Sequence, residues 1–140
     1  MSAKRSNATI AAKRSGVYRA PAPIDTVRKD AATAGLTWLD MPLAAVTNKQ
    51  QFLALCAKQM KLPPHFGENW DALADCVRDF AWLKSKGYVL HLTSGETFAR
   101  AAADDYETAL AVLSEAAAYW KDKDTPFFVL VDAAKDLPAF

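Results

Sequence analysis

Two short runs of almost unbroken apolar residues limit the fold of this chain more than any other feature. Tyr88–Leu92 reads YVLHL, and Phe127–Val131 reads FFVLV. Strands that are buried on both faces have this composition, and they are typical of parallel sheets covered by helices. The rest of the chain alternates strand and helix patterns. The sequence therefore predicts an α/β fold with right-handed crossovers between parallel strands.

The other predicted elements follow from apolar spacing and from helix start and stop signals. Gly35 ends the first helix, and Thr47 with Gln50 forms a capping box at the start of the next. Three strands from residue 36 onward form the expected parallel sheet, and the extension before it can add a fourth. The predicted strands outside the two apolar runs cover 16–21 and 36–41, and the predicted helices cover 24–35, 47–60, 70–80 and 106–121, with a short helix between 93 and 105.

Length and composition fit a compact protein without membrane contact. A chain of 140 residues fits one domain, and 51% hydrophobic residues suffice for a core. No apolar run approaches the length needed to cross a membrane. Cys56 and Cys76 are too few for a disulfide framework and are interpreted as small buried residues in a reducing compartment. We therefore expect a cytoplasmic protein.

Charge is unevenly distributed, although the formal net charge is only +1. Residues 1–30 contain seven Lys or Arg and two Asp, whereas residues 31–140 contain ten basic and fourteen acidic residues. Residues 1–15 are small, polar and basic, and they are predicted to form a flexible arm. They lack the apolar core of a secretory signal. The alternative that they form a transit-like peptide stays open. Residues 16–140 are predicted to form a single domain. Its acidic body favours a basic protein partner over direct nucleic-acid binding.

The helix that follows Asn69, its predicted N-cap, concentrates acidic residues on one side. At about 100° per residue, Asp71, Asp75 and Asp79 lie within about 80° of one another, and Glu68 precedes them on the same side. Each like-charge pair four residues apart costs a helix about 0.2–0.5 kcal/mol, so this face weakens the helix that carries it. The opposite side carries the apolar residues Trp70, Leu73, Val77 and Phe80.

A charged helix face is commonly no more than a solvated surface, and that interpretation stays open from the pattern alone. The loop before the helix, Leu62–Gly67, favours binding instead, because it places His65 and Phe66 beside the acidic face. Pro63 and Pro64 stiffen this loop, and a stiff loop loses less conformational entropy when it binds. Aromatic and acidic side chains together predict a surface that fits a cationic pocket.

Catalysis and metal binding are not predicted. The two histidines, His65 and His91, are far apart in the sequence, and no HxxE, CxxC or glycine-rich phosphate motif is present. Carboxylates on an open helix face simply ionise, and Cys76 leans toward the buried side of its helix, away from the acidic face. His91 is interpreted as a core or sheet-end histidine. We expect a protein that is not an enzyme and that uses no metal or cofactor.

The segment LPPHFGENWDALADC, Leu62–Cys76, resembles the signature of the barstar family, the intracellular inhibitors of secreted barnase-type ribonucleases. In that family a loop with prolines and aromatics leads through Gly-Glu-Asn into a helix reading Asp-Ala-Leu-x-Asp-Cys. The resemblance is strongest over 62–80 and extends more weakly over 36–132. It implies a barstar-like fold, with a small parallel sheet of three strands flanked by helices, and a bacterial immunity function against a ribonuclease toxin.

The family's mode of action implies roles for residues at matching positions. The loop aromatic and the acidic helix plug the active-site cleft of the ribonuclease, and a helix carboxylate replaces a substrate phosphate. Asp75 matches that phosphate mimic and Asp71 a second contact, while His65 takes the aromatic position over the guanine-binding region. Glu115 matches a peripheral acidic contact. The complete predicted partner-binding set is His65, Phe66, Glu68, Asp71, Ala74, Asp75, Asp79 and Glu115.

Three departures from the family pattern leave the partner open. Ala74 and His65 stand where the family has aromatic residues, Phe66 replaces a second tyrosine, and the N-terminal arm is basic. The expected partner is a basic ribonuclease or a related nuclease toxin, bound by a protein that is a monomer when free. Two alternatives remain. One is a regulatory protein-binding module that kept the scaffold but has a non-nuclease partner, and the other is an RNA-associated protein that uses its basic arm.

Overall fold

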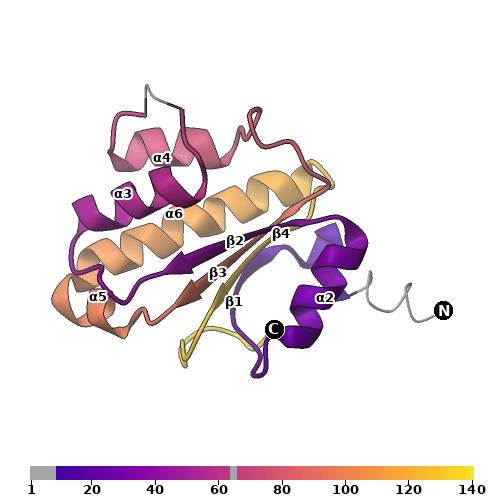
Figure 1. The fold of residues 1–140 in the computed structure, drawn as a ribbon, viewed down its shortest axis with the longest axis horizontal. Helices are drawn as coiled ribbons and strands as arrows, with labels where there is room; N and C mark the ends of the chain where they lie inside the picture. The colour runs from indigo at the N-terminus through magenta and orange to yellow at the C-terminus, as the bar shows by residue number, and fades with distance from the viewer. Residues whose placement is uncertain (1–8, 64–65) are drawn as a thin grey trace.

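The computed structural model describes residues 9–63 and 66–140 and contains a four-stranded parallel sheet (Figure 1). The strand order is β1-β4-β3-β2, and every neighbouring pair is parallel. The three-stranded sheet expected from residue 36 onward is therefore confirmed, and the N-terminal extension supplies the fourth strand at one edge. The strands are β1 Gly16–Arg19, β2 Thr37–Pro42, β3 Tyr88–Thr93 and β4 Phe127–Val131.

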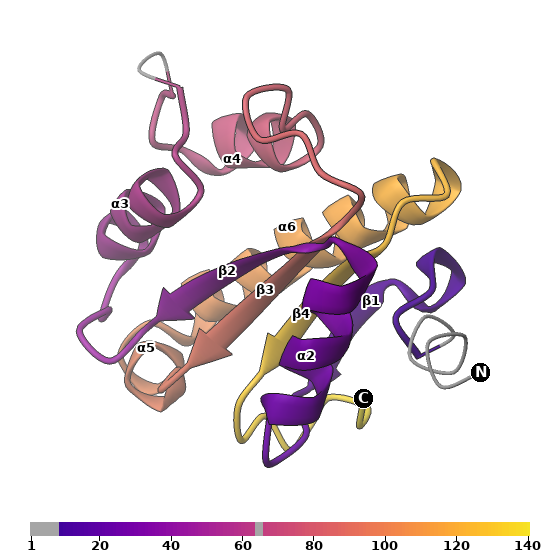
Figure 2. The same ribbon diagram turned by 45° about the vertical axis from the view of Figure 1, so that its right-hand side comes forward.

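Helices cover both faces of this sheet, as the apolar runs required. Figure 2 shows α2 in front of the sheet and α6 behind it, with α3, α4 and α5 on the same side as α6. Gly35 ends α2 in the left-handed conformation with φ 79°, which a residue without a Cβ adopts at little cost. The helices are α2 Asp25–Ala34, α3 Lys49–Gln59, α4 Trp70–Val77, α5 Glu96–Ala101 and α6 Ala103–Asp122, and a short 3₁₀ turn, η1, covers Ala12–Arg14.

Alternation along the strands divides the core into two unequal parts. In β4, Phe127, Val129 and Val131 enter the large core beneath α3 to α6, whereas Phe128 and Leu130 enter a smaller core beneath α2. Every residue of β4 is buried as a result, which explains why its sequence shows no alternation. We refer to the α2 side of the sheet, with its buried residues Ile10, Val27, Ala31, Leu36, Val89, Phe128 and Leu130, as the minor core.

The capping box predicted for α3 is displaced by one residue. Asn48, not Thr47, is the N-cap: its extended backbone allows Oδ1 to accept a hydrogen bond from the Gln51 N–H at 2.9 Å. The Gln51 side chain reaches back and accepts from the Thr47 N–H at 2.7 Å. Both Thr and Asn can cap a helix, and the backbone conformation at residue 48 selects between them.

The N-terminal segment differs from the flexible arm expected for residues 1–15. Residues 1–8 lie outside the described residues, but Ile10 is buried in the minor core with only 2% of its surface exposed. Ser15 Oγ accepts a hydrogen bond from the Phe127 N–H at 2.9 Å, which ties the segment to β4. One isoleucine is enough to dock a short segment, so residues 9–15 contact the fold, while the flexibility expected of residues 1–15 stays a prediction.

His91 is the buried polar side chain of the described core, with 7% of its surface exposed. Its Nε2 lies 2.8 Å from Asp132 Oδ1, and its ring meets Trp38 edge to face at 5.7 Å. The interpretation of His91 as a core or sheet-end histidine is confirmed. Cys56 is buried and Cys76 half-buried, and both are free thiols. Across the described ranges, no helix has the length and apolar character needed to cross a membrane.

Candidate protein-binding face on α4

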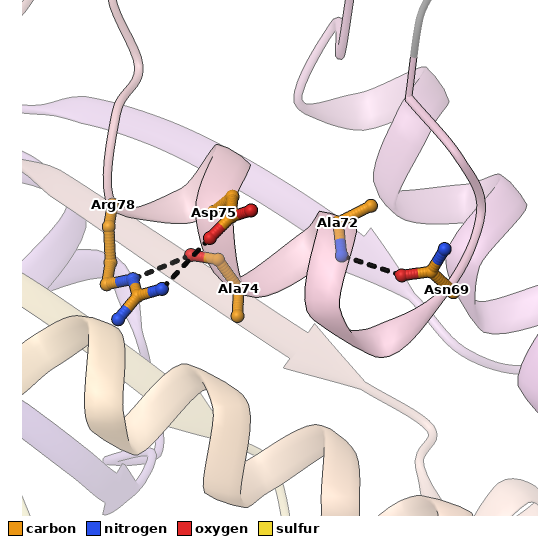
Figure 3. Close-up of polar contacts among 5 residues, drawn as sticks. All are labelled: Asn69, Ala72, Ala74, Asp75 and Arg78. Carbon is orange, nitrogen blue, oxygen red and sulfur yellow. Dashed lines mark hydrogen bonds and ion pairs between the residues drawn. The ribbon is translucent and has the colours of Figure 1, made fainter.

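The start of α4 is fixed by a side-chain cap. Asn69 has an extended backbone and its Oδ1 accepts a hydrogen bond from the Ala72 N–H at 2.8 Å, as predicted (Figure 3). Glu68, directly before the cap, has a left-handed backbone with φ 49°. This turn directs the chain out of the preceding loop and into the helix.

The inner side of α4 is anchored by apolar contacts. Leu73 and Val77 are fully buried, and the Trp70 ring lies 5.9 Å from that of Phe52 on α3. The Trp120 indole of α6 donates a hydrogen bond to the Val77 carbonyl at 2.7 Å. The predicted amphipathic helix is confirmed, but the Trp120 contact was missed, because a tryptophan on the apolar stripe of α6 signals burial and not its hydrogen-bond partner.

The helix ends at Val77, three residues earlier than predicted. Phe80 takes a left-handed conformation with φ 49° and stacks on Tyr88 with ring centroids 4.6 Å apart. Burying this ring in the large core turns the chain out of the helix. Asp79 therefore lies in the turn after α4, and its N–H bonds to the Cys76 carbonyl at 3.0 Å. Of the four predicted carboxylates, only Asp71 and Asp75 stand on the helix itself.

These carboxylates form what we call the acidic face: Glu68, Asp71, Asp75 and Asp79, all exposed. The side chain of Asp75 is 78% exposed, and its Oδ1 lies 3.1 Å from Nη2 of Arg78. Arg78 Nε also donates to the Ala74 carbonyl at 3.0 Å, so the guanidinium folds back along the helix (Figure 3). This ion pair neutralises part of the acidic face and relieves some of the like-charge repulsion along α4.

The other predicted partner-binding residues differ from one another in their exposure. Phe66 is half-buried and packs against the large core, so only part of its ring faces outward. Ala74 is half-buried on α4. Glu115 is exposed on α6, the helix against which α4 packs. His65, another member of the predicted set, lies outside the described residues.

The acidic face presents exposed carboxylate side chains to solvent. Burial raises the pKa of the Cys76 thiol, and the charges of Asp75 and Asp79 raise it further, so this cysteine is held in its protonated form. Within residues 9–63 and 66–140, no three His, Cys, Asp or Glu side chains gather as metal ligands would. The arrangement is suited to presenting negative charge to a cationic surface.

A cleft with a volume of about 800 Å³ lies elsewhere on the described part of the molecule. Its walls come from the loop after β1, the residues before α2, the C-terminal residues and the His91–Asp132 pair. None of the described residues of the acidic face lines it.

A parallel sheet under helices, with a capped helix that presents carboxylates to solvent, defines a small α/β protein with an acidic surface. A model of the family described as barstar, the barnase inhibitor, matches residues 37–132. The match covers more than half of the chain, so this protein belongs to the barstar family, as the Leu62–Cys76 signature indicated. Among curated proteins, no significant match was found.

Proposed function

We propose that this protein inhibits a basic ribonuclease by inserting the acidic face into its active-site cleft, where Asp75 takes the place of a substrate phosphate. One observation carries the proposal. Asp71 and Asp75 are exposed on a helix whose opposite side, Leu73 and Val77, is completely buried. Membership in a family described by its inhibition of barnase supports the same function.

The way α4 is held makes its carboxylates effective for binding. Asn69 fixes the first turn, and the Trp120 indole holds the last carbonyl. A preorganised helix loses little conformational entropy when a partner docks, so more of the interaction energy appears as affinity. Several exposed carboxylates on one side also steer a cationic protein toward the face and accelerate association.

The proposal describes a binding protein and not a catalyst. The raised pKa of the Cys76 thiol disfavours a thiolate nucleophile at this face. An inhibitor that protects the producing cell acts in the cytoplasm, where Cys56 and Cys76 remain reduced. We take the free protein to be a monomer that meets the nuclease through α4 and the residues around it.

One observation favours a second candidate, a regulatory module with a partner that is not a nuclease. Ala74 and the half-buried Phe66 leave the acidic face with little aromatic surface, although aromatic anchors commonly dominate binding energy at protein interfaces. The two candidates differ in a direct test on a ribonuclease.

The test titrates the purified protein into barnase and follows cleavage of a fluorogenic RNA substrate. We expect one-to-one inhibition that weakens as salt is added, because exposed charges are screened. Asp104→Ala, which removes an exposed carboxylate from the first turn of α6, serves as a matched control and is expected to inhibit like the parent. Cleavage that continues unchanged at a large excess of the protein contradicts ribonuclease inhibition and favours the regulatory module.

A further inference from the structure

Arg78 has unused hydrogen-bonding capacity directly beside Asp75. A guanidinium carries five N–H donors in a fixed plane. In this structure Nε donates to the Ala74 carbonyl and Nη2 to the Asp75 carboxylate. The other donors have no partner among residues 9–63 and 66–140, and the side chain is 42% exposed. Figure 3 shows the guanidinium alongside the helix, bridging the two acceptors.

A partner that covers Asp75 must also cover Arg78, since the two side chains are joined at 3.1 Å. Covering Arg78 removes water from its remaining donors. Each donor left without an acceptor then costs binding free energy, and the cost is larger when the donor is charged. A cleft lined only by cations repels Arg78, whereas a carboxylate among those cations accepts its hydrogen bonds in a charge-assisted geometry.

We propose that Arg78 determines specificity: it selects ribonucleases whose cationic cleft also contains a carboxylate within reach of the guanidinium. This inference rests on the proposed inhibition of a ribonuclease. In the complex, Asp71 and Asp75 face the cations of the partner and Arg78 faces the carboxylate. The partner thus recognises a pattern of opposite charges on this face and not a uniform negative surface.

A simpler role for Arg78 gives the opposite result. If Arg78 only competes with the cations of the partner for Asp75, removing it frees the carboxylate and strengthens binding. Exposed ion pairs contribute little to stability, so Arg78 gives up Asp75 easily and its loss barely disturbs the fold. The sign of the change in affinity therefore separates selection from competition.

The experiment measures double-mutant cycles between this protein and barnase. Arg78→Gln removes the charge, and Arg78→Lys keeps the charge but removes the planar fork. Arg100→Gln is the matched control, because Arg100 is likewise an exposed arginine at the C-terminal end of a helix, α5. On the barnase side, each Asp and Glu of the substrate cleft is replaced in turn by its amide. Inhibition constants give the affinity, and thermal melting confirms that each variant is folded.

We expect Arg78→Gln to weaken inhibition by about tenfold, because a charge-assisted contact is lost. One amide variant of barnase should lose most of its sensitivity to Arg78→Gln, and Arg78→Lys should lie between the parent and Arg78→Gln. Stronger inhibition by Arg78→Gln, or additive effects with every amide variant, overturns the inference while leaving ribonuclease inhibition intact. Failure of the parent protein to inhibit barnase overturns both proposals for this enzyme.

Discussion

The acidic face of α4 and the minor core under α2 have opposite relations to solvent. The acidic face is exposed and carries four carboxylates, one of which pairs with Arg78. The minor core is almost completely buried and apolar, and the buried His91, paired with Asp132, contacts Trp38 at its edge. In our proposal the first region meets another molecule, whereas the second stabilises the fold of this one.

The boundary of the family match runs through the minor core. Val89, Phe128 and Leu130 lie inside the matched residues 37–132, but Ile10, Val27 and Ala31, which cover them, lie outside. The whole acidic face lies inside. The comparison indicates that the residues before the matched region complete the fold of this chain, while the proposed binding face consists of residues within it. Substitutions in the two regions should then affect different measurements.

Replacing Asp75 should produce the largest effect, and it should appear in binding. Asp75→Ala leaves the cations of a ribonuclease buried without a partner, which costs about 2–5 kcal/mol and weakens inhibition at least about thirtyfold. The free protein loses one exposed ion pair and one like-charge neighbour, Asp71, so its melting temperature should change by no more than about 2 °C. Inhibition constants and thermal melts measure the two effects.

Asp79→Ala provides the comparison for that measurement. Asp79 lies in the turn after α4, so its removal should mainly slow association and reduce the salt dependence of the rate. Equal losses of affinity at Asp75 and Asp79 contradict a central role for Asp75. Unfolding of Asp75→Ala contradicts the separation of binding from stability.

Shortening Ile10 should act on stability alone. Ile10 is fully buried in the minor core, and replacing a buried isoleucine by alanine costs about 2–5 kcal/mol. Urea denaturation of Ile10→Ala should show this loss, while inhibition measured well below the midpoint stays at the parent value. Lys13→Ala, an exposed change in the same segment, should leave the midpoint unchanged. A midpoint for Ile10→Ala equal to that of the parent indicates that the segment is a flexible arm after all.

Removing the partner of His91 should have a smaller effect. Asp132→Ala leaves the buried imidazole without its hydrogen bond, which costs about 1–3 kcal/mol of stability. Asp132→Asn keeps an acceptor oxygen and should recover part of the loss. Asp136→Ala, a nearby exposed change, should cost little. Denaturation midpoints order the three variants, and a midpoint for Asp132→Ala above that of Asp132→Asn contradicts the assigned contact.

The sheet was predictable because its signals are local. Every residue of Phe127–Val131 is apolar, on both faces of the sheet. Gly35 marks the end of a helix because glycine readily adopts the left-handed backbone conformation. Asn69 was likewise identified as a cap from its side chain and position. These features depend on neighbouring residues in the sequence, so the sequence alone predicts them.

The parts that were wrong or missed depend on contacts between distant segments. The burial of Phe80 against Tyr88 ends α4 early, and Ile10 docks on strands more than 70 residues away. The partnership of His91 with Asp132 spans 41 positions. No local pattern encodes these pairings.

The smallest expected effect reports on the acidic face in the free protein. The charges of Asp75 and Asp79 contribute to the raised pKa of Cys76, and only the thiolate reacts with an alkylating reagent. Removing one nearby charge lowers that pKa and increases the thiolate fraction at mildly alkaline pH. We expect Asp75→Asn to accelerate alkylation of Cys76 by about two- to threefold at low salt. Arg78→Gln should slow it, because it removes a positive charge from the same surface.

Mass spectrometry of peptides from the alkylated native protein separates the two cysteines. Cys56 is fully buried, and burial raises the pKa of its thiol strongly, so it serves as an internal control that stays unmodified while the protein is folded. Added salt should bring the Cys76 rates of the parent and of Asp75→Asn together, because screening weakens the field of exposed charges. If Asp75→Asn and Arg78→Gln change the alkylation rate in the same direction, the substitutions have altered the access of the reagent to Cys76. Opposite changes show that the acidic face acts through its charge before any partner is bound.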